Sequence, residues 1–274
     1  EAYESPDVPK TGNGQSGDSY ASVTIKFPGT VTKSLPGDYN DVGTWTGRDN
    51  LNDVTVFLVN TTKGVVDYNS FAKSSFNAID ANGVLTPNLA LKATSGDNVR
   101  VYAVINGNSD IISTLKSTSA ANFANTFAGQ ASKIASQVAN YDGGTGKETI
   151  MMTNDVDNYV INVAPGIDET SAKTGTTNHA TVQVERVVSR GMVTVAPKTD
   201  VTAWTVKAVI AGVETPIATV TDVTYAVGQS NTKFYIMKKS TYETPDPVYT
   251  FNPAGADWTT NSKTYFDYSG LTSF

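Results

Sequence analysis

Apolar and polar residues alternate without interruption near the start of the chain. Every second residue from 21 to 27 is apolar: Ala21, Val23, Ile25 and Phe27. The residues between them are polar: Ser22, Thr24 and Lys26. A period of two with one apolar face predicts a half-buried β-strand. Pro28 and Gly29 follow at once and end the pattern.

Two further segments are apolar at nearly every position. They are VTVFLVN (Val54–Asn60) and VRVYAVIN (Val99–Asn106). Short runs rich in β-branched and aromatic residues are typical of strands that are buried on both faces. We therefore predict two buried strands here.

The spacing of apolar residues changes between Ser109 and Tyr141. Apolar side chains recur at helical intervals: Ile111, Ile112, Leu115, Phe123, Phe127, Ile134 and Val138. Ser117–Ser119 divides the region into two helical pieces, and Asp142 followed by two glycines ends the second. Such a pattern favours helices that pack on a sheet over a cofactor-binding segment.

The rest of the chain is predicted to consist mainly of strands. These are Glu148–Pro165, His179–Pro197, Ala203–Val213, Thr219–Gln229 and Thr232–Lys239. The polar residues 166–178 are predicted to be a linker, and residues 1–20 a flexible leader. This pattern predicts a mainly β protein with two β-sandwich domains, one at 21–165 with a helical segment near 110–140 and one at 179–274.

The composition of the chain excludes several classes of partner and of binding site. Hydrophobic residues make up 39% of the 274 residues, which is enough for a core, and the net charge is −6. An acidic chain without a cluster of basic residues does not fit a nucleic-acid partner. The chain has no cysteine, which excludes disulfides and thiolate metal sites. No run of about 18 apolar residues is present to span a membrane.

Candidate catalytic chemistry is sparse. His179 is the only histidine, and no G-x-S-x-G motif accompanies it, so we interpret it as a turn or surface residue. Asp155 and Asp157 could help to hold calcium, but the twelve-residue calcium loop is absent and solvated carboxylates are the favoured interpretation. The sequence therefore predicts no enzyme activity, no cofactor and no metal.

One segment carries a family resemblance. VQVERVVSRGMVTV (Val182–Val195), with Arg186 and Arg190, resembles the strand that opens the C-terminal domain of the Bacteroidetes fimbrilins, the type V pilins. It is most similar to the structural subunits of the short, or minor, fimbriae. Six further segments resemble this family in order and spacing: Tyr20–Gly29, Val42–Val59, Val99–Asn106, Glu148–Asn154, Ala218–Lys239 and Tyr265–Leu271.

The resemblance implies a fold and an assembly mechanism. Fimbrilins have two transthyretin-like β-sandwich domains and reach the cell surface through the outer membrane as lipoprotein precursors. In these proteins a protease cuts after a basic residue that follows the first strand in the sequence, and the first strand is lost. A strand from a neighbouring subunit then takes the place of the lost strand. The matching cut here lies between Lys33 and Ser34. The removable strand carries Ala21, Val23, Ile25 and Phe27. The family has Arg at the cut, so Lys33 indicates a lysine-specific protease.

The resemblance also implies partners. They are other copies of the chain in a fibre, accessory, tip and anchor subunits, the processing protease, and receptors on host or bacterial surfaces. Fimbrilins carry a lipid-bearing cysteine before the leader and continue beyond Tyr265–Leu271. We therefore expect the C-terminal domain to be incomplete. The chain as given would receive a donor strand in its N-terminal domain without supplying one.

Two alternative functions stay open at this point. The first is a tip or anchor adhesin of the same superfamily. The second is a glycan-binding surface lipoprotein or secreted glycosidase, in which Trp258, Tyr265 and Tyr268 would stack on sugars.

Overall fold

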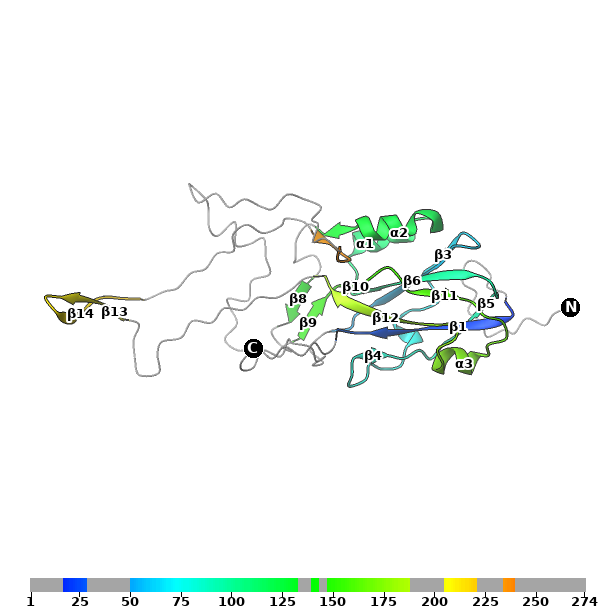
Figure 1. The fold of residues 1–274 in the computed structure, drawn as a ribbon, viewed down its shortest axis with the longest axis horizontal. Helices are drawn as coiled ribbons and strands as arrows, with labels where there is room; N and C mark the ends of the chain where they lie inside the picture. The colour runs from blue at the N-terminus through cyan, green and yellow to red at the C-terminus, as the bar shows by residue number, and fades with distance from the viewer. Residues whose placement is uncertain are drawn as a thin grey trace.

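The computed structural model describes residues 17–28, 50–132, 139–142, 147–187, 205–220 and 234–239. Its principal sheet has the strand order β3-β2-β6-β10-β12-β1-β4, with β11 added to β6 and β5 added to β1 (Figure 1). These strands are β1 (Ser19–Lys26), β2 (Val54–Asn60), β3 (Val65–Asp67), β4 (Val84–Leu85), β5 (Leu91–Ala93), β6 (Asn98–Ile105), β10 (Met152–Asn154), β11 (Val160–Asn162) and β12 (His179–Arg186).

The remaining elements are short. They are the 3-10 turn η1 (Lys73–Ser75), the helices α1 (Ser109–Lys116), α2 (Ala120–Gly129) and α3 (Glu169–Thr174), and the strands β7 (Ala131–Ser132), β8 (Ala139–Asp142), β9 (Lys147–Ile150), β13 (Thr205–Ile210), β14 (Val213–Thr219) and β15 (Phe234–Tyr235). The predicted mainly β fold is confirmed. The division into two transthyretin-like domains stays a prediction.

The central strands β2 and β6 are buried on both faces, as their apolar sequences predict. Val56 of β2 belongs to a core shared with β1 and β12, whereas its neighbour Phe57 belongs to a second core under α1 and α2. Val101 and Tyr102 of β6 divide between the two cores in the same way. Since successive strand residues point to opposite faces, an apolar run is what a strand between two cores requires.

Helices α1 and α2 cover one face of the sheet, and α3 lies next to β1 (Figure 1). Helix α1 begins at the Asn108 cap, whose side chain accepts hydrogen bonds from the amides of Asp110 and Ile111. Phe123 and Phe127 of α2 are fully buried, with ring centroids 4.9 Å from that of Tyr102. The two predicted helices that pack on a sheet are therefore confirmed.

The second helix ends earlier than its apolar spacing predicts. Gln130 is extended, residues 131–132 form β7, and residues 139–142 form β8 rather than helix. Strand β7 pairs with β15, and Gln130 accepts a hydrogen bond from the amide of Ile236. Gly129 is a weak helix former, and the residues directly after it pair with this distant segment. This pairing outweighs the helical spacing of the apolar residues.

Residues 166–178 also differ in the structure from the linker that the sequence predicts. Those residues include α3, whose Ala172 is fully buried, instead of forming only a linker. His179–Arg186 pairs with β1 and β10, and its Val182 lies in the same core as Val23. The first sheet therefore extends through residue 186. How the chain divides into domains beyond that point stays a prediction.

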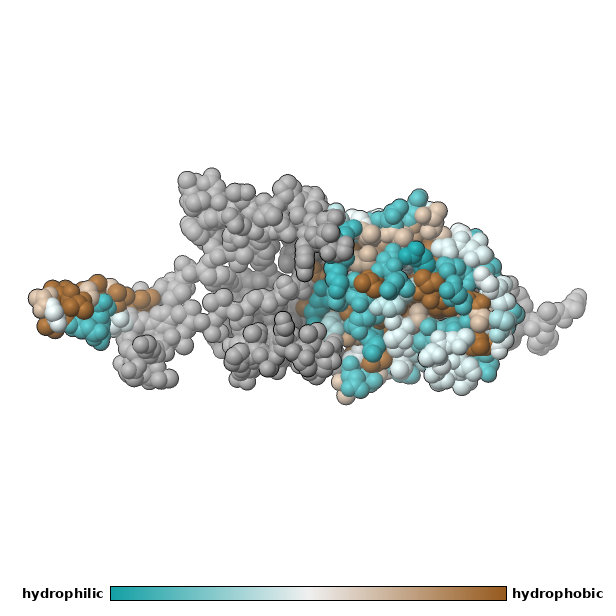
Figure 2. Space-filling model, viewed as in Figure 1, coloured by the Kyte–Doolittle hydropathy of each residue, from teal (hydrophilic) through white to brown (hydrophobic). Residues whose placement is uncertain are grey.

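Strands β13 and β14 form a hairpin that pairs with no other described strand. Its turn contains Ala211 and Gly212, both with positive φ, as a two-residue hairpin turn requires. Apolar residues gather on this hairpin (Figure 2), and Val209 is 71% exposed. Across the described ranges, no helix has the length and apolar character needed to cross a membrane.

Candidate functional site: the surroundings of the first strand

Strand β1 is an interior strand of the sheet. On one side it pairs in parallel with β12, from Ser22 opposite His179 to Lys26 opposite Gln183. On the other side it pairs in antiparallel fashion with β5 and then with β4. We call the β1 site the two flanking edges, β12 on one side and β4 with β5 on the other, together with the side chains that contact β1 between them.

The apolar face of β1 is anchored in the core. Val23, Ile25 and Phe27 are 1%, 0% and 3% exposed. Burial of three such side chains contributes roughly 5–9 kcal/mol before the cost of ordering the strand. Ala21 lies on the same face but is only half-buried. The apolar side chains of the predicted first strand therefore contact the core.

The polar face of β1 is also buried at Ser22 and Thr24, which the prediction of a half-buried strand missed. The Ser22 hydroxyl donates to the carbonyl oxygen of Leu89 at 2.6 Å, and Thr24 Oγ1 lies 2.6 Å from His179 Nε2. The other ring nitrogen, His179 Nδ1, lies 2.6 Å from the Ala172 carbonyl oxygen. A carbonyl only accepts, so Nδ1 carries a proton and the ring joins β1 to α3.

This arrangement gives His179 a structural role. Thr24 is 9% exposed, so the hydroxyl beside the ring is withdrawn from solvent and from any substrate. The ring's second partner is a backbone carbonyl and not a carboxylate. A triad-like arrangement, in which a carboxylate orients the histidine, is therefore not formed at His179.

The start of β1 is held by polar contacts. The Asn178 amide nitrogen donates to Ser19 Oγ at 2.9 Å and to the Tyr20 carbonyl oxygen at 3.0 Å. Asp18 accepts from the amide and hydroxyl of Ser95 at 2.8 and 2.7 Å. The backbone hydrogen bond, followed by the hydroxyl bond, lowers the pKa of the Asp18 carboxyl below its ordinary value of 3.8.

Asn178 gives a first prediction. Its φ is +54°, a region in which asparagine is tolerated and alanine is strained, and its side chain also bonds both backbone groups of Ala164. Asn178→Ala is expected to lower the free energy of unfolding by about 2–4 kcal/mol, because buried partners lose their hydrogen bonds. Urea unfolding followed by circular dichroism measures this loss.

The control is Asn77→Ala, at an exposed asparagine, which should change stability by less than about 0.5 kcal/mol. Equal stabilities of the two variants would contradict the role of Asn178 at the β1 site.

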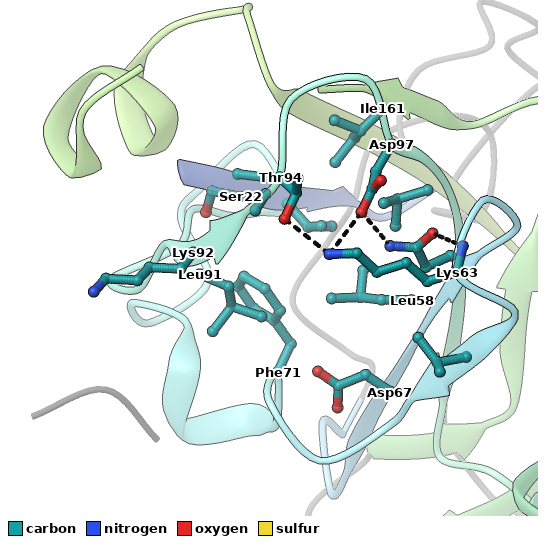
Figure 3. A pocket seen from close by; sticks show the side chains of 16 residues that line it. Ser22, Leu58, Lys63, Asp67, Phe71, Leu91, Lys92, Thr94, Asp97 and Ile161 are labelled. Carbon is teal, nitrogen blue, oxygen red and sulfur yellow. Dashed lines mark hydrogen bonds and ion pairs between the residues drawn. The ribbon is translucent and has the colours of Figure 1, made fainter. Parts of the chain in front are cut away.

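A cavity of about 70 Å³ borders the first half of β1 (Figure 3). Ala21, Ser22 and Val23 of β1 form part of its wall, opposite residues of β2, β5 and β11. Lys63 lies across the polar rim, where its ammonium group pairs with Asp97 at 3.1 Å and donates to Thr94 Oγ1 at 2.8 Å.

The other predicted site residues have different outcomes. Lys33 and Ser34 lie outside the described residues, as do Arg190, Trp258, Tyr265 and Tyr268, so the predicted cut and the sugar-stacking aromatics stay predictions.

The two carboxylates considered for calcium have protein partners. Asp155 accepts from the Tyr159 hydroxyl at 2.5 Å, and Asp157 pairs with Arg100 at 2.6 Å. Burial raises the pKa of Tyr159 to about 12, so this tyrosine stays protonated as a donor at neutral pH. In the described ranges no three acidic or histidine side chains lie together as a metal site would require.

Asn178 and α3 were missed by the sequence interpretation. One signal was available for each: an asparagine directly before a strand tolerates the left-handed conformation. Asp168, followed by Glu169 in the first turn, is a typical helix start.

Two curated relatives are similar over nearly the whole chain. Both are named minor fimbrium subunit Mfa1 and come from Porphyromonas gingivalis. They are 28% and 29% identical over 281 aligned residues, which covers 96% of this chain and 53% of each relative. The chain thus spans about half the length of the relatives that it matches. No family model matches the chain.

A crystal structure of a candidate cell adhesion protein from Parabacteroides distasonis is also similar, at 14% sequence identity. The match covers 61% of this chain and 46% of that one, with a TM-score of 0.32. The relatives by sequence confirm the resemblance to Bacteroidetes fimbrilins.

Proposed function

We propose that this chain, a relative of minor fimbrium subunits, is a structural subunit of a bacterial surface fimbria and not an enzyme. It polymerises when its first strand is removed and a strand from a neighbouring copy takes the vacated position. The observation that carries the proposal is the position of β1, the first described strand, which is inserted between two edges that belong to later parts of the chain.

The physics of the exchange follows from this position. Removal of β1 exposes backbone groups on β12 and on β4 with β5, together with the apolar core that Val23, Ile25 and Phe27 now cover. An extended peptide can restore both the hydrogen bonds and the side-chain burial. Where such a head-to-tail contact does not close into a ring, it generates a filament.

The wider proposal includes the biological setting. The subunit has two transthyretin-like domains and reaches the cell surface as a lipoprotein precursor. A protease cuts it after Lys33, and it assembles with further copies and with accessory, tip and anchor subunits to support adhesion. The support is the similarity to fimbrial subunits along 96% of the chain. Within the described residues, no feature favours the glycan-binding alternative.

Mass spectrometry of purified fibres tests this proposal. Fibre subunits are expected to begin at Ser34, whereas the unassembled precursor retains residues 21–27. Fibres whose subunits still contain Ala21 to Phe27 would contradict strand removal.

A further inference from the structure

The cavity beside β1 is apolar where it meets the strand. Its apolar lining from other parts of the chain includes Leu58, Phe71, Leu91, Val99 and Ile161. Its volume of about 70 Å³ exceeds the roughly 10–15 Å³ that a single water molecule needs. The space therefore accommodates an aliphatic side chain that is larger than a methyl group.

The polar groups at the rim already have protein partners. Asp97 accepts from the Asn60 amide at 2.8 Å and pairs with Lys63. Asp67 accepts from the backbone amides of Asn69 and Ser70 at 2.9 and 3.2 Å, and from the Ser70 hydroxyl. These carboxylates are satisfied, and Lys92, which also belongs to the lining, extends its ammonium group away from the other lining side chains (Figure 3). Apolar contact is therefore what the cavity can supply.

Ala21 is the smaller of the two apolar β1 residues that line this space, the other being Val23. It stands in the same row as Val23, Ile25 and Phe27, two residues before the first of them. Those three side chains are fully buried, whereas the methyl group of Ala21 lines the cavity and leaves it open. The side chains of β1 therefore fill the β1 site at Val23, Ile25 and Phe27 and leave an unfilled volume beside Ala21.

We propose that the cavity receives a branched aliphatic side chain, leucine or isoleucine, from the strand of a second copy that replaces β1. This inference rests on the proposed function. The occupant follows from the position of the cavity: it continues the row of side chains on the apolar face of β1, so a strand that pairs at the β1 site places its corresponding residue there. The incoming strand then binds more tightly than β1, which gives the exchange its direction.

The first test uses the intact chain. Ala21→Leu fills the cavity from β1 itself and is expected to raise the midpoint of thermal unfolding by about 3–6 °C. Lys26→Leu adds the same side chain at an exposed position of the same strand and is expected to leave the midpoint unchanged. A lower midpoint for Ala21→Leu would overturn the inference, because it would mean that the space does not admit the side chain.

The second test measures strand exchange. The full chain carries an engineered protease site in place of residues 30–35 and is cut there, so that β1 is no longer covalently attached to the sheet. Fluorescent peptides with the sequence of residues 19–27 are then added in the native, Ala21→Leu and Lys26→Leu forms. The Ala21→Leu peptide is expected to bind about tenfold or more tightly than the other two, by fluorescence anisotropy.

The outcomes separate the two proposals. Equal binding of the native and Ala21→Leu peptides would overturn the role of the cavity and leave strand exchange intact. No binding of any peptide, with β1 retained after the cut, would overturn the proposed function and the cavity's role as a receptor with it.

Discussion

Cells that carry Lys33→Ala are expected to accumulate an uncut subunit and to form essentially no fibres. The substitution removes the basic residue that follows the first strand, so the protease cannot cut there. Strand β1 then stays covalently attached and the β1 site stays filled. Folding should not change, because the sequence predicts a loop around Lys33, between Gly29 and Pro36, where a single substitution usually alters stability by less than about 0.5 kcal/mol. Electron microscopy and the mass of the subunit measure the two effects.

Two matched variants sharpen this prediction. Lys10→Ala removes a lysine ahead of the strand, where a cut would leave β1 in the chain, and it should form normal fibres. Lys33→Arg keeps the charge but should resist a lysine-specific protease while accepting an arginine-specific one. Normal fibres from Lys33→Ala would mean that the cut lies elsewhere or that the strand is not removed.

Replacement of Ile25 by aspartate is expected to lower the free energy of unfolding by more than about 4 kcal/mol. Ile25 is fully buried and lies opposite Val182 of β12 and Leu85 of β4, so the carboxylate would stand without a partner in an apolar core. Urea unfolding followed by circular dichroism is the measurement.

Lys26→Asp is the matched control for this variant. It introduces the same carboxylate at the adjacent residue, which is exposed, and should change stability by less than about 1 kcal/mol. If both variants unfolded alike, β1 would not be an integral strand of the sheet.

The sequence predicts strands accurately where both faces of the strand are buried. Strand β2 has the predicted bounds, and β6 is shifted by one residue, because their apolar runs are long and lie between two cores. It predicted β1 as half-buried because Ser22 and Thr24 look like surface residues. Their partners are distant in the sequence, Leu89 for Ser22 and His179 for Thr24, and local alternation carries no information about such partners.

The site was predictable only in part. Period-two alternation identifies Val23, Ile25 and Phe27 as core residues, and the family resemblance suggests that they belong to a removable strand. Neither indicates that β1 pairs in parallel with β12, nor that Ala21 borders a cavity. Register and unfilled volume arise from the packing of several segments, so they appear only in three dimensions.

The parallel pairing of β1 with β12 has a further consequence for folding kinetics. The contact between Lys26 and Gln183 joins residues 157 positions apart, while β2 pairs with β3 through a short turn. Contacts of such long range close late and slowly, because the intervening chain must first be ordered. We expect β1 to dock after most of its sheet has formed. A strand that docks late requires the rest of its sheet to be folded already. A replacement strand from another copy would require the same folded sheet.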